Sequence, residues 1–244
     1  MARLIALDDS HGMTTAGKRT PSIKELGGRV ILENEFSRAV VNYLSIELKR
    51  CGFNTLMVAP GDNDISLASR VNLANAKNAD AYISIHFDAF DGKFDGNDPE
   101  GLTVHVYPDS ANSKKLGNAI LNHLKGGTSQ QNRGVKESNF YVLRRTKMIA
   151  ILSENGFMDN KREAMLMLDT NFQKEVAREH AKGICDYFNV KYIDKIVVAK
   201  PVDKNNNVKT FYRVVTGSFA ERSNAEDRII ELKKAGFESF IAIN

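Results

Sequence analysis

Residues 3–12 read RLIALDDSHG, and this stretch sets the pattern for the rest of the chain. Its apolar run, Leu4 to Leu7, is typical of a short buried strand. The run stops at two carboxylates, a serine, a histidine and a glycine, which mark a turn. The stretch therefore predicts a strand whose end carries polar side chains, with His11 as a candidate metal ligand.

Similar apolar runs alternate along the chain with segments of helical periodicity. Strands are expected at residues 3–7, 54–59, 81–86, 101–108 and 150–155, and helices at residues 35–50, 65–78, 113–125, 162–168 and 172–188. Strands that alternate with helices form a largely parallel sheet. The sequence therefore predicts an α/β domain with a mostly parallel, twisted sheet that is flanked by helices on both faces.

The composition changes near residue 195. Residues 197–210, VVAKPVDKNNNVKT, carry a proline and three consecutive asparagines, which is typical of a linker. The rest of the tail has a strand–helix–strand pattern. We expect a main domain over residues 1–190, a linker over 191–209 and a small C-terminal βαβ module over 210–244. Such a short module cannot build a stable core alone, so it is expected to pair with another surface.

The charge balance excludes some classes of partner. The 244-residue chain has 34 Lys and Arg against 30 Asp and Glu, a net charge of +4. This excess is too small to predict a nucleic-acid partner, and no motif of that kind is present.

No apolar run approaches the roughly 20 residues of a transmembrane segment, and the N-terminus lacks the pattern of a signal peptide. We therefore expect a protein that is made in the cytoplasm.

Four residues stand where an α/β sheet places its functional sites, at the ends of strands and helices. His11 follows the first strand, His86 closes the third, and Glu33 stands just ahead of the first helix. Two histidines and a carboxylate with an open fourth position are typical of a hydrolytic zinc site. Glu154 lies inside an apolar strand, where a carboxylate is costly to bury without a partner, and it suits a general base.

Taken alone, each of these residues has an ordinary structural alternative. His86 would look the same as a hydrogen-bonded core histidine, and His11 as a polar turn residue. Glu33 would favour a helix N-terminus through the helix dipole. The spacings between the four residues match no short zinc motif, so the residues alone leave the question open.

Four segments of the chain resemble the motifs of zinc-dependent N-acetylmuramoyl-L-alanine amidases of the amidase-3 type. They are, in order, LDDSHG, ENEFSRAV, SIHFDA and LSENGFMDN. The resemblance covers roughly residues 1–189. It implies Zn²⁺ ligands at His11, Glu33 and His86, a catalytic carboxylate at Glu154, and hydrolysis of the amide between N-acetylmuramic acid and L-alanine in peptidoglycan.

Neighbouring residues of the same motifs receive supporting roles. Asp8 or Asp9 is expected to orient His11 from behind and so fix its tautomer. Asp88 and Asn155 are candidates for the substrate groove.

Two residues depart from the family pattern. The family commonly has glycine where Ser10 stands, and a positive φ there would strain a serine. It commonly has asparagine at the position of Asp88, which adds negative charge near the proposed zinc. Neither departure removes a ligand.

The tail, residues 211–244, resembles half of a SPOR-type peptidoglycan-binding domain. This implies binding to the cell wall, and a homodimer in which two halves complete a four-stranded sheet. Without a signal peptide, we expect the protein to reach the wall after lysis or through a holin-type pore. That setting suits a phage or prophage endolysin, or an autolysin that acts late in sporulation.

Two alternatives to a zinc amidase remain at this point. Glu33 and Glu154 would suit the carboxylate pair of a metal-independent peptidoglycan glycosidase, although this leaves both histidines unexplained. A non-catalytic wall-binding protein, with the tail as its functional part, is the other alternative.

Overall fold

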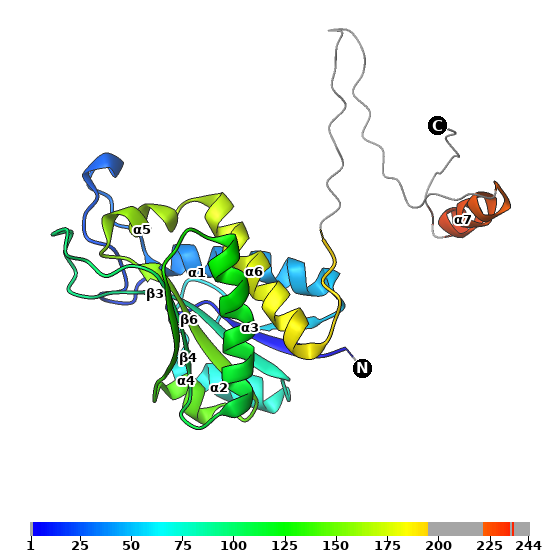
Figure 1. Ribbon diagram of the computed structural model, residues 1–244, viewed down its shortest axis with the longest axis horizontal. Coiled ribbons are helices and arrows are strands. Elements are labelled where there is room, and N and C mark those ends of the chain that lie inside the picture. Colours follow the sequence, from blue (N-terminus) through cyan, green and yellow to red (C-terminus); the bar gives the residue numbers. More distant parts are fainter. Residues whose placement is uncertain (1, 195–221, 235, 237–244) are drawn as a thin grey trace, which may run out of the picture. The chain divides into compact units, whose positions relative to one another are not determined.

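The computed structural model describes residues 2–194, 222–234 and 236 (Figure 1). It divides into two units, Met1–Ile193 and Asp194–Asn244, and the second is described through helix α7 (Arg222–Lys234). Most of the expected linker and both expected strands of the small module lie outside the described residues. Within the described ranges, no helix is long and apolar enough to span a membrane.

The first unit is built from six strands and six α-helices. The strands are β1 (Leu4–Asp8), β2 (Asn54–Met57), β3 (Ala81–Asp88), β4 (Leu102–Val106), β5 (Asn132–Glu137) and β6 (Ile149–Phe157). The helices are α1 (Glu33–Arg50), α2 (Leu67–Ala76), α3 (Ala111–Gly127), α4 (Tyr141–Arg145), α5 (Lys161–Leu166) and α6 (Thr170–Phe188), with a short 3-10 helix at Lys24–Leu26.

All six strands form one sheet in the order β2-β1-β3-β6-β4-β5. Strands β2, β1, β3 and β6 are mutually parallel, whereas β4 is antiparallel to β6 and parallel to β5. The predicted mostly parallel sheet is therefore confirmed. The chain passes from β3 to β4 through residues 89–101 without a crossover helix, which leaves β4 pointing the opposite way.

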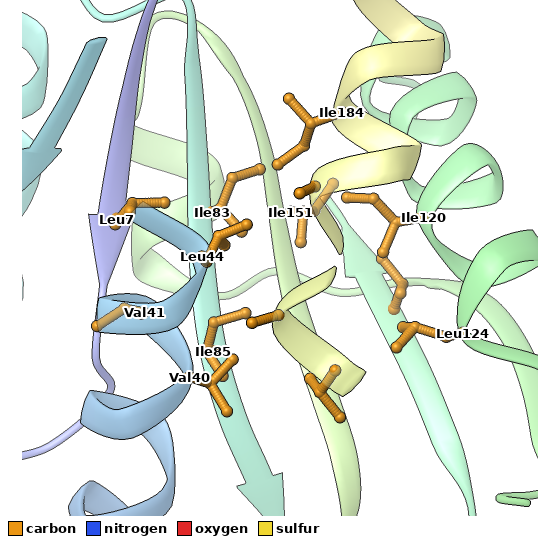
Figure 2. Close-up of a cluster of buried hydrophobic side chains, with 14 of the residues drawn as sticks. Leu7, Val40, Val41, Leu44, Ile83, Ile85, Ile120, Leu124, Ile151 and Ile184 are labelled. Carbon is orange, nitrogen blue, oxygen red and sulfur yellow. The ribbon is translucent and has the colours of Figure 1, made fainter. Parts of the chain in front are cut away.

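Helices cover both faces of this sheet, as predicted. On one face, α1, α3 and α6 pack on the strands (Figures 1 and 2). The buried side chains drawn there include Leu7, Val40, Leu44, Ile83, Ile85, Ile120, Leu124, Ile151 and Ile184. On the other face, residues of α2 and α4 pack against Ala6, Tyr82, Ala150 and Leu152. Successive side chains along each strand point to opposite faces of the sheet, and for this reason the two apolar clusters are separate.

The side chains on the face covered by α2 and α4 change from apolar to polar along the strands. Tyr82 and Leu152 belong to its apolar cluster. Residues of the same strand parity further along, Ser84 and His86 on β3 and Glu154 on β6, are polar. The fold therefore gathers polar side chains at the carboxyl ends of the central parallel strands, where α/β proteins place their sites.

Candidate metal centre

Three predicted ligands converge in the structure. Ligand atoms from His11, Glu33 and His86 all lie within 4.8 Å of one another. Glu33 Oε1 is 2.9 Å from His86 Nδ1, and Glu33 Oε2 is 3.7 Å from His11 Nε2. The two imidazole rings stand edge to face, with centroids 5.3 Å apart. Two nitrogen donors and a carboxylate thus surround one small volume, as in a zinc site that keeps a position open.

Each ligand comes from a different kind of element. His11 lies in the loop after β1, and His86 lies near the end of β3. Glu33 is the first residue of α1, so the helix begins two residues earlier than the expected residue 35, and Glu33 lies in it rather than ahead of it. Glu35 accepts a hydrogen bond from the backbone N–H of Leu32 and caps this helix end. The helix N-terminus favours the negative charge of Glu33.

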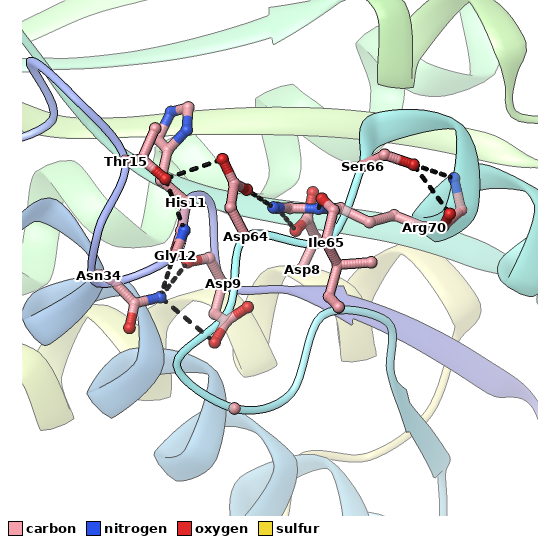
Figure 3. Close-up of polar contacts among 12 residues, drawn as sticks. Asp8, Asp9, His11, Gly12, Thr15, Asn34, Asp64, Ile65, Ser66 and Arg70 are labelled. Atoms are coloured by element: carbon pink, nitrogen blue, oxygen red, sulfur yellow. Dashed lines mark hydrogen bonds and ion pairs between the residues drawn. The ribbon is translucent and has the colours of Figure 1, made fainter.

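The loop that carries His11 is held from two sides (Figure 3). Gly12 packs so closely on the segment before α2 that an added Cβ would lie 2.4 Å from Asp64 N. Its N–H donates to Thr15 Oγ1, which donates to Asp64 Oδ2. The side-chain amide of Asn34 donates to the carbonyl of His11. The loop is therefore tied both to α1 and to the segment before α2.

Ser10 has the positive φ that would strain a serine. Ser10 has a φ of 66°, in the left-handed region, and it is buried. Its hydroxyl has no hydrogen-bond partner among the described residues. A side chain in this region is strained, and serine gains no hydrogen bond in return.

The charge states of His11 and Glu33 suit a cation. Burial lowers the pKa of His11 to about 4, so its imidazole is neutral near pH 7. Burial also lowers the pKa of His86, but the hydrogen bond and charge of Glu33 outweigh it and raise that pKa. His86 in turn outweighs burial at Glu33 and holds its carboxyl pKa below the usual value. Glu33 Oε2 is buried without a hydrogen-bond partner among the described residues, so a divalent cation would fit there.

Glu154 stands beside this cluster. It lies directly opposite His86 in the register of β3 and β6. Its Oε2 is buried and has no hydrogen-bond partner in the described part of the chain. Burial raises the pKa of Glu154 to about 8, against the charge of His86 and together with the charges of Glu33 and Asp88. A carboxylate with such a pKa takes up and releases protons near neutral pH.

The structure does not bring Asp8 to the His11 ring. Asp8 is buried at the end of β1 and accepts hydrogen bonds from three side chains. Their donors are Arg70 Nη1 at 2.7 Å, the Tyr82 hydroxyl at 2.7 Å and the Ser84 hydroxyl at 2.8 Å. Sequence reasoning missed Arg70 and Ser84, because an arginine in a helix and a serine in a strand carry no signal of burial.

Asp9 also has other partners. It is buried and lies 3.5 Å from Asn34 Nδ2 and 3.4 Å from Arg38 Nε. Burial raises its pKa, with a further contribution from the charge of Asp8. No hydrogen bond joins either aspartate to the His11 ring within the described residues. The expected orientation of His11 by one of them is therefore not what the structure shows.

The two groove candidates differ. Asp88 is half-buried at the end of β3, and its carboxylate accepts a hydrogen bond from the backbone N–H of Ala89. Asn155 is fully buried and donates to the carbonyl of His86 at 3.0 Å. Successive strand residues point to opposite faces and Glu154 occupies the polar one, so a place for Asn155 in the substrate groove stays a prediction. Asn155 holds the backbone of His86.

Comparisons with known proteins agree with this geometry. The family model Amidase_3, N-acetylmuramoyl-L-alanine amidase, matches residues 5–186, and a SPOR domain model matches residues 177–242, starting within α6. The sporulation-specific N-acetylmuramoyl-L-alanine amidase of Bacillus subtilis is 27% identical over 98% of this chain and 84% of its own length. The endolysin of Bacillus phage SPP1 is 31% identical over 86% of this chain and 75% of its own length.

A solved structure shares the fold. The crystal structure of N-acetylmuramoyl-L-alanine amidase from Clostridium difficile 630 superposes with a TM-score of 0.68 at 27% identity, covering 77% of this chain and 97% of that one. The family match spans most of the chain and includes every residue of the metal centre. The chain therefore belongs to the Amidase_3 family of zinc-dependent N-acetylmuramoyl-L-alanine amidases, which act on peptidoglycan, and it carries a C-terminal SPOR domain.

Proposed function

We propose that His11, Glu33 and His86 hold the zinc ion of this amidase and that Glu154 carries the proton in its reaction. The bond cleaved joins the lactyl group of N-acetylmuramic acid to L-alanine of the stem peptide. The observation that carries the proposal is the register of β3 and β6, which sets Glu154 opposite a ligand of the cluster. Glu154 is also the carboxylate next to the cluster that has an unpartnered buried oxygen and a raised pKa.

The proposed roles follow from the chemistry of the groups. Zinc bound at such a site acts as a Lewis acid that activates water and polarises the scissile carbonyl. Glu154 accepts a proton from the attacking water and delivers it to the nitrogen of the leaving amine. At the proposed zinc site, Glu33 supplies a negative charge and His11 supplies a neutral imidazole nitrogen.

This assignment leaves no role for a glycosidase pair. Glu33 approaches both histidines and is almost completely buried, so it cannot also act on a sugar from an open cleft. The alternative of a non-catalytic wall-binding protein predicts that Glu154 can be replaced without effect. The family match and the intact cluster instead favour catalysis by the first unit.

The ligand and proton-carrier roles are tested by metal content and activity measured on the same preparations. His86→Ala should lose the bound zinc, whereas Glu154→Gln should keep it and lose roughly 10²–10⁴-fold in hydrolysis of peptidoglycan. His123→Ala is the matched control, because His123 pairs with Asp186 on the surface and should keep both zinc and activity. Zinc-loaded Glu154→Gln with normal activity would overturn the assignment.

We further propose that the C-terminal part binds peptidoglycan and pairs two copies of the chain. The SPOR match supports the first role, and the small size of the predicted module, residues 210–244, supports the second. We also propose that the catalytic domain covers residues 1–190 and that the linker covers residues 191–209. Sizing the chain with and without residues 191–244 tests it, and a full-length monomer would refute the pairing.

The names of the relatives bear on the biological setting. One is a sporulation-specific amidase and another is an endolysin. We propose that this enzyme dissolves the wall of the cell that made it, with access through lysis or a holin-type pore. Transcript timing in a host culture separates the two settings: expression with prophage induction indicates an endolysin, and expression late in sporulation indicates an autolysin.

A further inference from the structure

Arg70 of α2 is buried beneath the metal centre, although it is neither a ligand nor part of the proposed chemistry. Only 1% of its side chain is exposed. The guanidinium donates to Asp8 Oδ1 at 2.7 Å, to Asp64 Oδ1 at 2.8 Å and to the carbonyl of Ile65 at 2.7 Å (Figure 3). Burying a cation costs several kcal/mol unless it is paired and hydrogen-bonded, and here each of the three guanidinium nitrogens has an acceptor, two of them carboxylates.

One carboxylate connects Arg70 with His86. We name Asp8 and Ser84 the Asp8 arm. Asp8 Oδ2 accepts the hydroxyl proton of Ser84 at 2.8 Å, and Ser84 Oγ lies 3.0 Å from His86 Nε2. Both members of the arm are buried, Ser84 completely. Water therefore has little access to this chain of hydrogen bonds.

The hydrogen bonds of the Asp8 arm determine which ring nitrogen of His86 carries a proton. A carboxylate in a salt bridge only accepts hydrogen bonds, so the single hydroxyl proton of Ser84 is directed at Asp8. Ser84 Oγ can then only accept from His86, which places a proton on Nε2. With Nε2 held by Ser84, the ring nitrogen that faces the cluster and can bind a metal is Nδ1, the atom that lies 2.9 Å from Glu33 Oε1.

The other carboxylate connects Arg70 with the loop of His11. We name Asp64 and Thr15 the Asp64 arm. Asp64 Oδ2 accepts from Thr15 Oγ1 at 2.8 Å, and Thr15 Oγ1 accepts from the N–H of Gly12 at 3.0 Å. Gly12 follows His11 directly and lies against the backbone of Asp64. This arm fixes the loop and, through it, the place of the imidazole.

We propose that Arg70 is a positioning residue for both histidine ligands, through the Asp8 arm to His86 and through the Asp64 arm to His11. One guanidinium fork then sets the separation of two ligands that are far apart in the sequence. The inference rests on the proposed ligand assignment. It goes beyond that assignment because it says what holds the ligands before the metal arrives.

The test measures the zinc dissociation constant of the full chain by competition with a chromophoric chelator. Ser84→Ala breaks the Asp8 arm and should weaken zinc binding by roughly 10–100-fold, the usual effect of losing a partner of a ligand. Ser45→Ala is the matched control, since Ser45 is a buried serine whose hydroxyl pairs with Thr55 away from the centre. Thr15→Val keeps the side-chain shape, breaks the Asp64 arm and should also weaken zinc binding.

A second measurement separates positioning from general destabilisation. Proton–nitrogen spectra of the histidine rings in the zinc-loaded protein should show a slowly exchanging proton on Nε2 of His86. Ser84→Ala should lose that signal, while the melting temperature of its zinc-free form stays close to that of Ser45→Ala. Arg70→Lys should weaken zinc binding at least as much as Ser84→Ala, because an ammonium group lacks the fork that spans both carboxylates.

The outcomes are distinguishable. If His86→Ala binds zinc as the natural chain does, the ligand assignment itself fails. If His86→Ala loses zinc but Ser84→Ala and Thr15→Val bind it as tightly as Ser45→Ala, Arg70 does not position the ligands and the inference is overturned. Should Arg70→Lys not fold, the variants of Ser84 and Thr15 decide the question.

Discussion

His86 and Glu154 lie directly opposite each other on the neighbouring parallel strands β3 and β6. Neighbouring strands are about 4.8 Å apart, and opposed residues of a parallel pair point to the same face. The backbone hydrogen bonds of the sheet therefore set the separation of the proposed proton carrier from the metal cluster. A site built on strands in this way is held more tightly than one built on loops.

The first prediction is that Glu154→Gln stabilises the zinc-free fold while it removes activity. The pKa of Glu154 is raised to about 8 by burial, so the folded chain favours the protonated form. The stability that this form contributes is complete at acid pH and is lost as the pH rises through about 8. At pH 9 glutamine should raise the free energy of unfolding by about 1–3 kcal/mol, because no charge is buried.

Urea unfolding of the zinc-free protein at pH 4 and pH 9 checks this prediction. The gain from Glu154→Gln should be small at pH 4, where the glutamate is already protonated in the folded chain. An equal gain in the free energy of unfolding at pH 4 and pH 9 would show that the buried charge is not its cause.

The second prediction concerns Ser10. Its φ of 66° and its unpartnered hydroxyl mean that glycine would relieve strain without loss of a hydrogen bond. Ser10→Gly should stabilise the fold by about 0.5–1 kcal/mol, after the greater flexibility of glycine in the unfolded chain is counted.

Asn189→Gly is the comparison for Ser10. Asn189 also has a positive φ, 54°, at the end of α6, but asparagine tolerates this region better than serine. Thermal unfolding should show the larger gain for Ser10→Gly. A lower melting temperature for that variant would mean that the serine side chain contributes to the loop in another way.

The third prediction assigns an effect to the other departure from the family pattern. The negative charge of Asp88 helps to raise the pKa of Glu154. Asp88→Asn removes that charge, so the pKa of Glu154 should fall. Because a general base must be deprotonated to act, the acidic limb of the pH–rate profile should move to lower pH. Asp91→Asn, on the exposed loop that follows, should leave the limb in place.

How far the sequence predicts this structure depends on the kind of signal. Buried strands with polar ends located His11, His86 and Glu154, because an apolar run that stops at such residues marks the carboxyl end of a strand. Strand β5 (Asn132–Glu137) was not predicted, since NRGVKE is polar and pairs only at the edge of the sheet. The reversed direction of β4 was also invisible, because alternating patterns give the order of elements and not the path of a loop.

The supporting residues were harder to predict than the ligands. Asn155 is a groove candidate from the sequence, but it follows Glu154 on β6, and neighbours along a strand point to opposite faces. Asp8 was expected behind His11, yet its partners are Arg70, Tyr82 and Ser84. Contacts between residues that are far apart in the chain form only when the strands pair, so a local sequence pattern does not predict them.

With zinc bound, this chain should hydrolyse the amide between N-acetylmuramic acid and L-alanine. The decisive measurement is the chemical identity of the ends released from purified peptidoglycan by the zinc-loaded enzyme, by the chelated enzyme, and after zinc is restored. We predict new N-terminal L-alanine amines without new reducing sugar ends, lost on chelation and regained with zinc. New reducing ends, or amine release that persists in the metal-free enzyme, would contradict the account.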